Sequence, residues 1–105
     1  MIAEISVQDL QNMRQNNENF QLIDVREPYE YEHSNLGGEN IPLAMLPLNL
    51  DKIANDKKLI LQCRSGGRSA QAAMFLQQKG YKDVYNLRGG MMAWAREIDP
   101  SVSVA

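Results

Sequence analysis

Apolar residues recur along this chain in two alternating patterns, one typical of helices and one typical of buried strands. A helix is predicted over 7–15, because Ser6 and Asp9 resemble a capping box and apolar residues follow at helical spacing. The short apolar run at 22–25 is typical of a buried strand, and a second short helix is predicted over 29–32. Strand and helix therefore already alternate in the first third of the chain.

The middle of the chain carries a weaker pattern. Glycines and a proline mark a loop around a brief extended segment at 40–41. Leu46, Leu50 and Ile53 then form an apolar stripe, and we expect this stripe to lie on a helix that Pro47 starts.

The second half repeats the alternation more strongly. A strand is predicted at 59–62 and another at 83–86, with a helix between them that starts near Ser69 and ends at Gly80. Short strands that alternate with helices predict an α/β domain with a mostly parallel sheet. A last helix precedes Pro100, and its expected inner face consists of Met91, Trp94, Ala95 and Ile98.

The composition is that of one compact domain, which we place over 1–105. The chain has 105 residues, of which 44% are hydrophobic and 23% charged, and no linker is long enough to separate two domains. A formal charge of −2 with scattered Lys and Arg argues against nucleic acid as a partner. Because no 18 apolar residues run together and the first residues do not resemble a leader, we expect no membrane partner and a cytoplasmic location.

The single cysteine limits the chemistry further. One Cys cannot form an internal disulfide or a Cys-rich metal site, so we expect neither a metal nor another cofactor. The thiol of Cys63 is then either a small buried group without a chemical role or a reactive one.

Cys63 lies in the segment Q-C-R-S-G-G-R-S, residues 62–69, between a predicted strand and a predicted helix. In an open parallel sheet, ligands bind at this end of the strands. The two glycines tolerate positive φ, so backbone N–H groups can turn inward around an anion. The helix N-terminus and the charges of Arg64 and Arg68 favour the thiolate, and cysteines in such settings reach a pKa of roughly 3.5 to 7.5. The candidate substrate contacts are the six residues that follow the cysteine: Arg64, Ser65, Gly66, Gly67, Arg68 and Ser69.

Four segments of the chain resemble the rhodanese family of sulfurtransferases. Residues 63–69 are similar to the family's active-site loop, and residues 22–27 to its D-V-R-E strand end. Residues 37–42 look like its G-x-x-N-I-P segment, and residues 85–94 like its V-x-x-L-x-G-G-x-x-A-W signature. The resemblance implies a rhodanese-like fold, which is an α/β fold with a five-stranded, mostly parallel sheet flanked by helices on both faces.

The same resemblance implies a sulfurtransferase of the thiosulfate type. Cys63 would accept a sulfane sulfur from a small anionic donor such as thiosulfate and pass it, as a persulfide, to a thiol, cyanide or a protein acceptor. A binding or sulfur-carrier module without catalysis is one alternative. A phosphatase or arsenate reductase is another, but those enzymes place five residues between Cys and Arg, whereas four separate Cys63 from Arg68.

Polar residues outside the loop have simpler interpretations. Asp24 and Arg26 end a predicted strand on the same edge of the sheet, where they either support the loop or contact substrate directly. The acidic residues Glu27, Glu30 and Glu32 are interpreted as a solvated helix surface.

For two further residues, His33 and Trp94, we expect a structural role. The family's usual His aligns with Ser34, so we expect His33 to be a surface or helix-end residue. Trp94 has the spacing of a buried helix face, and we expect it to pack in the core.

Overall fold

The computed structural model describes residues 2–105, and its centre is a five-stranded sheet in which all neighbouring strands are parallel. The strands follow the order β1-β5-β4-β2-β3 across the sheet. This arrangement confirms the predicted α/β class and parallel sheet. The strands are β1 (Ala3–Ile5), β2 (Phe20–Asp24), β3 (Glu39–Asn40), β4 (Lys58–Gln62) and β5 (Val84–Leu87).

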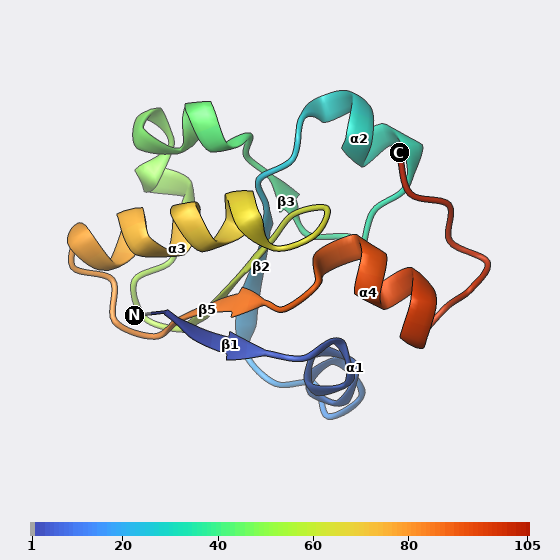
Figure 1. Ribbon diagram of the computed structural model, residues 1–105. Coiled ribbons are helices and arrows are strands. Elements are labelled where there is room, and N and C mark those ends of the chain that lie inside the picture. The colour runs from blue at the N-terminus through green and yellow to red at the C-terminus, as the bar shows by residue number, and fades with distance from the viewer. Residues whose placement is uncertain (1) are drawn as a thin grey trace.

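Helices cover both faces of the sheet (Figure 1). The α3 helix and the 3-10 segments lie on one face, and α1 and α4 lie on the other. The helices are α1 (Val7–Gln15), α2 (Pro28–His33), α3 (Gly67–Gln78) and α4 (Gly90–Glu97), and the 3-10 helices are η1 (Leu43–Leu48) and η2 (Leu50–Lys52). No helix among residues 2–105 has both the length and the apolar character needed to cross a membrane.

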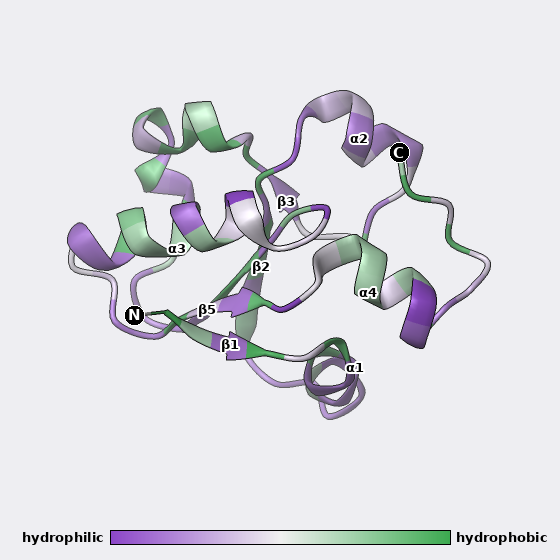
Figure 2. Cartoon of the chain, in the orientation of Figure 1, coloured by the Kyte–Doolittle hydropathy of each residue, from purple (hydrophilic) through white to green (hydrophobic). Residues whose placement is uncertain are grey.

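Each central strand contributes to two hydrophobic cores, because successive side chains of a strand point to opposite faces. Leu59 and Leu61 of β4 pack in the core under α3, whereas Ile60 between them packs in the core under α1 and α4. A sheet that is buried on both faces needs continuous apolar runs rather than alternation, which is what the sequence has at these strands. Figure 2 shows the complementary pattern on α3, where hydrophobic and hydrophilic residues alternate along the helix.

The predicted start of the first helix is confirmed in detail. The Ser6 hydroxyl accepts a hydrogen bond from the Asp9 backbone N–H at 3.0 Å, and the Asp9 carboxylate accepts one from the Ser6 N–H at 3.0 Å. Two N–H groups that would otherwise lack partners are thereby satisfied, and Asp performs the role that Glu or Gln usually has in a capping box.

Two parts of the fold differ from the sequence prediction. The expected helix started by Pro47 is wrong, because η1 and η2 are separate 3-10 turns and Pro47 lies inside η1. The strand β1 was not predicted, since only three residues form it and two of them are exposed. It joins the sheet as an edge strand by pairing with β5. A short exposed strand has no apolar pattern by which the sequence could reveal it.

The strand register places the cysteine segment at the carboxyl edge of the sheet. Asp24 of β2 lies opposite Gln62 of β4, so Cys63 is the first residue beyond the strand. The α3 and α4 helices begin soon after the carboxyl ends of β4 and β5, respectively. Two helix N-termini and the Cys63 segment therefore meet at one edge.

Candidate active site

The segment from Cys63 to Ser69 folds around the cysteine sulfur. Cys63 Sγ accepts hydrogen bonds from the Gly66 N–H at 3.1 Å, the Ser69 N–H at 3.3 Å and the Ser69 hydroxyl at 3.2 Å. Only 1% of the Cys63 surface is exposed. The sulfur is therefore surrounded by donors, which is an environment suited to a negative charge.

The loop keeps its N–H groups inward because its carbonyl groups are held from behind. The Met91 N–H donates to the Cys63 carbonyl and the Met92 N–H donates to the Arg64 carbonyl, each at 3.0 Å. Asn86 Nδ2 donates to the Gly66 carbonyl at 3.2 Å. These contacts come from β5 and the first turn of α4, so that part of the chain fixes the peptide orientations of the loop.

Two glycines allow the Cys63 loop and the first turn of α4 to lie in close contact. Gly66 is the N-cap of α3 and has φ +111°. A residue with a side chain rarely adopts this backbone angle. Gly90 has φ +54°, and a Cβ there would lie 2.3 Å from the Cys63 carbonyl oxygen. Gly67, which was also expected to supply a positive φ, is instead the first residue of α3 and has open space around it.

The electrostatics of the site favour the thiolate. Burial raises the pKa of the Cys63 thiol, but hydrogen bonds from Ser69, Gly66 and Ser65 act in the opposite direction and leave the pKa below its ordinary value. The donors are most effective when the sulfur is charged, because a charge-assisted hydrogen bond is stronger than a neutral one. Cys63 is accordingly the candidate nucleophile of the site.

Ser69 links the sulfur to a buried amide that the sequence analysis did not identify. Its hydroxyl lies 3.2 Å from Cys63 Sγ and 2.5 Å from Asn86 Oδ1, and both Ser69 and Asn86 are buried. A hydroxyl has one proton, so Ser69 can donate fully to only one of these acceptors at a time. Asn86 also holds the loop through the Gly66 carbonyl. It lies inside the 85–94 segment, but an isolated Asn gives no signal of such a role.

Arg68 forms a bidentate ion pair across the mouth of the loop. Its Nη1 and Nη2 lie 2.7 Å and 2.9 Å from the two carboxylate oxygens of Glu30. Glu30 was interpreted as part of a solvated helix surface, and that interpretation is wrong, since only 5% of its surface is exposed. Three acidic residues close together on a short polar helix look alike in sequence, and only the position of α3 distinguishes Glu30 from the other two.

Arg64 and Ser65 lie on the outer side of the loop and are exposed. The Arg64 side chain has a different partner, because its Nε donates to the Ala105 backbone oxygen at 2.9 Å. The two arginines of the segment therefore have different surroundings, although the charges of both were expected to favour the thiolate.

Asp24 and Arg26 form a fully buried ion pair behind the loop. Arg26 Nη2 lies 2.7 Å from Asp24 Oδ2, and both side chains have no exposed surface. Arg26 also donates to the Ser34 carbonyl at 2.8 Å and to the Glu30 carbonyl at 3.4 Å. The pair thus attaches α2 to the end of β2. This geometry suits the expected supporting role, and neither side chain reaches the surface where a substrate would bind.

His33 is the last residue of α2 and is exposed, with Nε2 2.9 Å from the Ser103 hydroxyl. This placement agrees with a helix-end residue. Trp94 is half-buried and packs against the core under α1 and α4, where the Arg14 guanidinium lies 5.7 Å from the centre of its ring.

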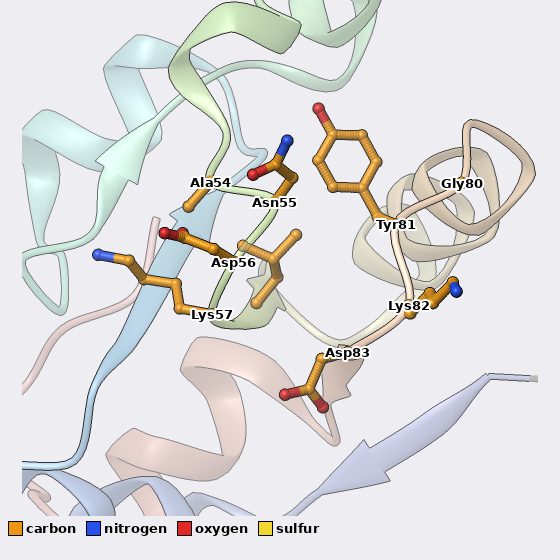
Figure 3. A pocket seen from close by; sticks show the side chains of 9 residues that line it. Ala54, Asn55, Asp56, Lys57, Gly80, Tyr81, Lys82 and Asp83 are labelled. Atoms are coloured by element: carbon orange, nitrogen blue, oxygen red, sulfur yellow. The ribbon is translucent and has the colours of Figure 1, made fainter.

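A cavity of about 520 Å³ lies at the opposite, amino end of the sheet. Figure 3 shows that its walls come from the segments that precede β4 and β5. Leu59 also lines it. Asn55, Lys57 and Asp83 give it a polar lining. No cluster of three or more potential metal ligands occurs among residues 2–105.

Known proteins are similar to this chain in sequence and in fold. The rhodanese-like domain family matches residues 6–97. This protein belongs to the rhodanese-like family. A sulfurtransferase of Allochromatium vinosum is 36% identical over 104 residues, which cover 98% of this chain and 97% of the relative.

Solved structures of rhodanese-like proteins have the same fold. The crystal structure of a rhodanese-like domain protein from Staphylococcus aureus matches with a TM-score of 0.85 and 27% identity, over 99% of each chain. The structure of reduced Bacillus anthracis CoADR-RHD also matches with a TM-score of 0.85, at 32% identity, but there the match covers 99% of this chain and 18% of the other. The fold expected from the four sequence segments is thereby confirmed.

Proposed function

We propose that this protein is a sulfurtransferase that carries a sulfane sulfur as a persulfide on Cys63. The donor would be thiosulfate or a related sulfane-sulfur compound, and the acceptor a thiol, cyanide or a protein thiol. The proposal depends above all on one observation, which is that three donors of a single loop converge on the Cys63 sulfur. Relatives that are named sulfurtransferases support a sulfur-transfer role in general.

The first half of the proposed reaction loads the cysteine. The Cys63 thiolate uses an electron pair to form a bond with the outer sulfur of the donor, and the bond between the two donor sulfurs breaks. The electron pair of that bond leaves with the inner fragment, which is sulfite when the donor is thiosulfate. No net oxidation occurs, because one S–S bond replaces another.

The second half returns the enzyme to its starting state. A nucleophilic acceptor attacks the outer sulfur of the Cys63 persulfide, and the S–S bond breaks with its electron pair on Cys63. With cyanide as acceptor the product is thiocyanate. The N–H groups of Gly66 and Ser69 stabilise the Cys63 thiolate before sulfur is loaded and after it is released, so the same donors act in both halves.

A phosphatase reaction fits this loop less well. The loop is one residue shorter than the loop of phosphatases, because four residues separate Cys63 from Arg68 where they place five. The alternative of a binding module is tested together with the proposal, because a module that only binds would load no sulfur. A sulfur carrier without turnover would load and release one sulfur, so repeated turnover of thiosulfate and cyanide to thiocyanate separates it from a catalyst.

Intact-mass measurement tests the proposal. After incubation with thiosulfate, or with a thiol persulfide, and removal of excess donor, the protein mass should rise by one sulfur atom. Cyanide or a small thiol should return the mass to its starting value. The chain has no second thiol to resolve the persulfide, so the adduct should persist until an acceptor is added.

Cys63→Ser is the control, and it should show no adduct while keeping the far-ultraviolet circular dichroism of the wild type. An adduct of the same mass on Cys63→Ser would remove Cys63 from the mechanism. Wild-type protein that gains no sulfur from either donor would favour the binding module instead.

A further inference from the structure

The Glu30 carboxylate is held in place by three donors. The Glu27 N–H donates to Glu30 Oε1 at 3.0 Å, and the two outer nitrogens of Arg68 bind its two oxygens. The Arg68 guanidinium lowers the pKa of Glu30 to about 2, so this carboxylate is charged throughout the range in which a sulfurtransferase could work. Its backbone is fixed as well, because the buried Arg26 donates to the Glu30 carbonyl.

The partner of Glu30 is a positive charge that interacts with the reacting group. Arg68 directly precedes Ser69, whose N–H and hydroxyl donate to the Cys63 sulfur, and the Cys63 thiolate contributes to raising the pKa of Arg68. The positive charge that could attract an anionic donor is therefore already paired with a fixed negative charge. The other arginine of the loop, Arg64, is exposed, and its Nε donates to the Ala105 backbone oxygen.

The pairing of Glu30 with Arg68 determines how much positive charge is available to the Cys63 thiolate and to a bound donor. With Glu30 present, the negative charge of the Cys63 thiolate is matched by Arg68 only in part, since Arg68 is shared with Glu30. A donor that brings two negative charges adds repulsion that the loop N–H groups must offset, whereas a donor with one charge or none adds less.

We propose that Glu30 is a specificity-determining residue that makes this site select sulfane-sulfur donors carrying at most one negative charge, such as thiol persulfides, over the dianion thiosulfate. This inference rests on the proposed sulfur transfer through Cys63. In the favoured reaction the Cys63 thiolate bonds to the outer sulfur of the persulfide, the donor S–S bond breaks, and its electron pair leaves on the donor thiolate.

Two exposed side chains with apolar surface belong to residues whose backbone or neighbours contact the loop. Tyr29, which precedes Glu30, is 69% exposed, and it lies close enough to Arg68 to contribute to the raised pKa of that residue. Met92 is also exposed, and its N–H holds the Arg64 carbonyl. The carbon skeleton of a thiol persulfide could cover these side chains, whereas thiosulfate has no carbon with which to do so.

A pair of matched donors separates charge from other effects. Thiosulfate and the methanethiosulfonate anion both carry an outer sulfane sulfur, but a methyl group in the second replaces a charged oxygen of the first. The measurement is kcat/KM for each donor with cyanide as acceptor, expressed as the ratio of thiosulfate to methanethiosulfonate. Intrinsic differences in donor reactivity cancel when this ratio is compared between variants.

Glu30→Gln should raise the ratio about tenfold, since it frees the charge of Arg68 while keeping an oxygen that can accept from the guanidinium. Arg68→Gln should lower the ratio by a similar factor. In the double variant the two effects should largely cancel, to within roughly threefold of the wild type. Glu32→Gln is the matched control, because it removes the same charge from an exposed position of α2, and its ratio should stay at the wild-type value.

Glu30→Asp adds a conservative comparison, and it should keep the wild-type ratio even if both rates fall. Equal losses with both donors in Glu30→Gln would show that the ion pair only shapes the loop, and they would overturn the inference. If Glu30→Gln does not fold, an unchanged ratio in Arg68→Gln has the same meaning. Failure of wild type to accept sulfur from either donor is a different result, which removes the proposed function itself.

Discussion

The two ends of the sheet differ in open volume and in the groups that surround it, and the difference shows which end of this fold can support chemistry. The amino end has a cavity of about 520 Å³ with lysines, acidic residues and a tyrosine around it (Figure 3). The carboxyl end has a nearly closed loop in which the cysteine is 1% exposed. Volume alone would select the amino end, whereas the candidate nucleophile is at the carboxyl end.

Backbone direction explains the difference. At the carboxyl end the α3 helix begins beside the sulfur, so its free N–H groups point toward a shared centre. At the amino end the chain leaves the helix α3 and enters the strand β5, and the side chains that line the cavity are mostly exposed. A concave surface without converging buried donors offers space but little means to stabilise a developing charge.

The largest expected effect concerns the contact that closes the carboxyl end. Gly90→Ala should destabilise the protein by about 2–4 kcal/mol, because the new Cβ meets the Cys63 carbonyl and the positive φ disfavours a side chain. Urea unfolding followed by circular dichroism measures this loss. Gly67→Ala is the matched control at a glycine with open space, and its stability should change by less than about 1 kcal/mol.

The two glycine variants also test the comparison between the ends. If Gly90→Ala and Gly67→Ala had equal stability, the contact between α4 and the loop would not be what holds the carboxyl end closed. In that case the inward orientation of the N–H groups would need another cause.

Ser69→Ala should have a moderate effect on the reactivity of Cys63, because it removes one of the three donors to the sulfur. The pKa of the Cys63 thiol should rise, since hydrogen bonds from Ser69 lower it in the native protein. A lowered thiol pKa means that the thiolate is present down to lower pH, so the alkylation rate of Cys63 should reach half its maximum at a higher pH in the variant. Iodoacetamide modification followed by mass across pH measures both curves.

At neutral pH the alkylation of Ser69→Ala should be slower by about tenfold or less, which corresponds to one hydrogen bond. An unchanged midpoint would mean that the Ser69 hydroxyl donates to Asn86 Oδ1 and contributes nothing to the thiolate. Ser65→Ala serves as the comparison, because it removes a hydroxyl of the same loop but keeps the Ser65 backbone N–H, which is the group of this residue that lowers the pKa of Cys63.

The smallest effect is expected at the amino end. Lys82 lines the cavity there and is exposed, so Lys82→Ala should change sulfur transfer by less than about twofold. Steady-state rates with either donor provide the measurement. A larger decrease would show that the two ends are coupled, and it would contradict the view that the cavity is separate from the reaction.

Much of this architecture was accessible from the sequence. The apolar runs at β2, β4 and β5 predict buried strands, because a parallel sheet covered on both faces requires them. The segment around Cys63 predicts an anion-binding loop, because glycines and a helix start directly after a strand leave backbone N–H groups free. These features are local, and a local pattern of residues is enough to specify them.

The tertiary structure alone decided which polar residues act together. Glu30 reaches Arg68 across 38 positions of the chain, and Asn86 reaches Ser69 across 17. Nothing in their local sequence distinguishes Glu30 from Glu32, since both lie on the same short polar helix. The sheet order brings β2 beside β4, and α2 thereby lies next to the start of α3. Charge pairing across elements depends on such packing, so the sequence by itself determined the candidate nucleophile and its loop, whereas the fold determined which charges surround them.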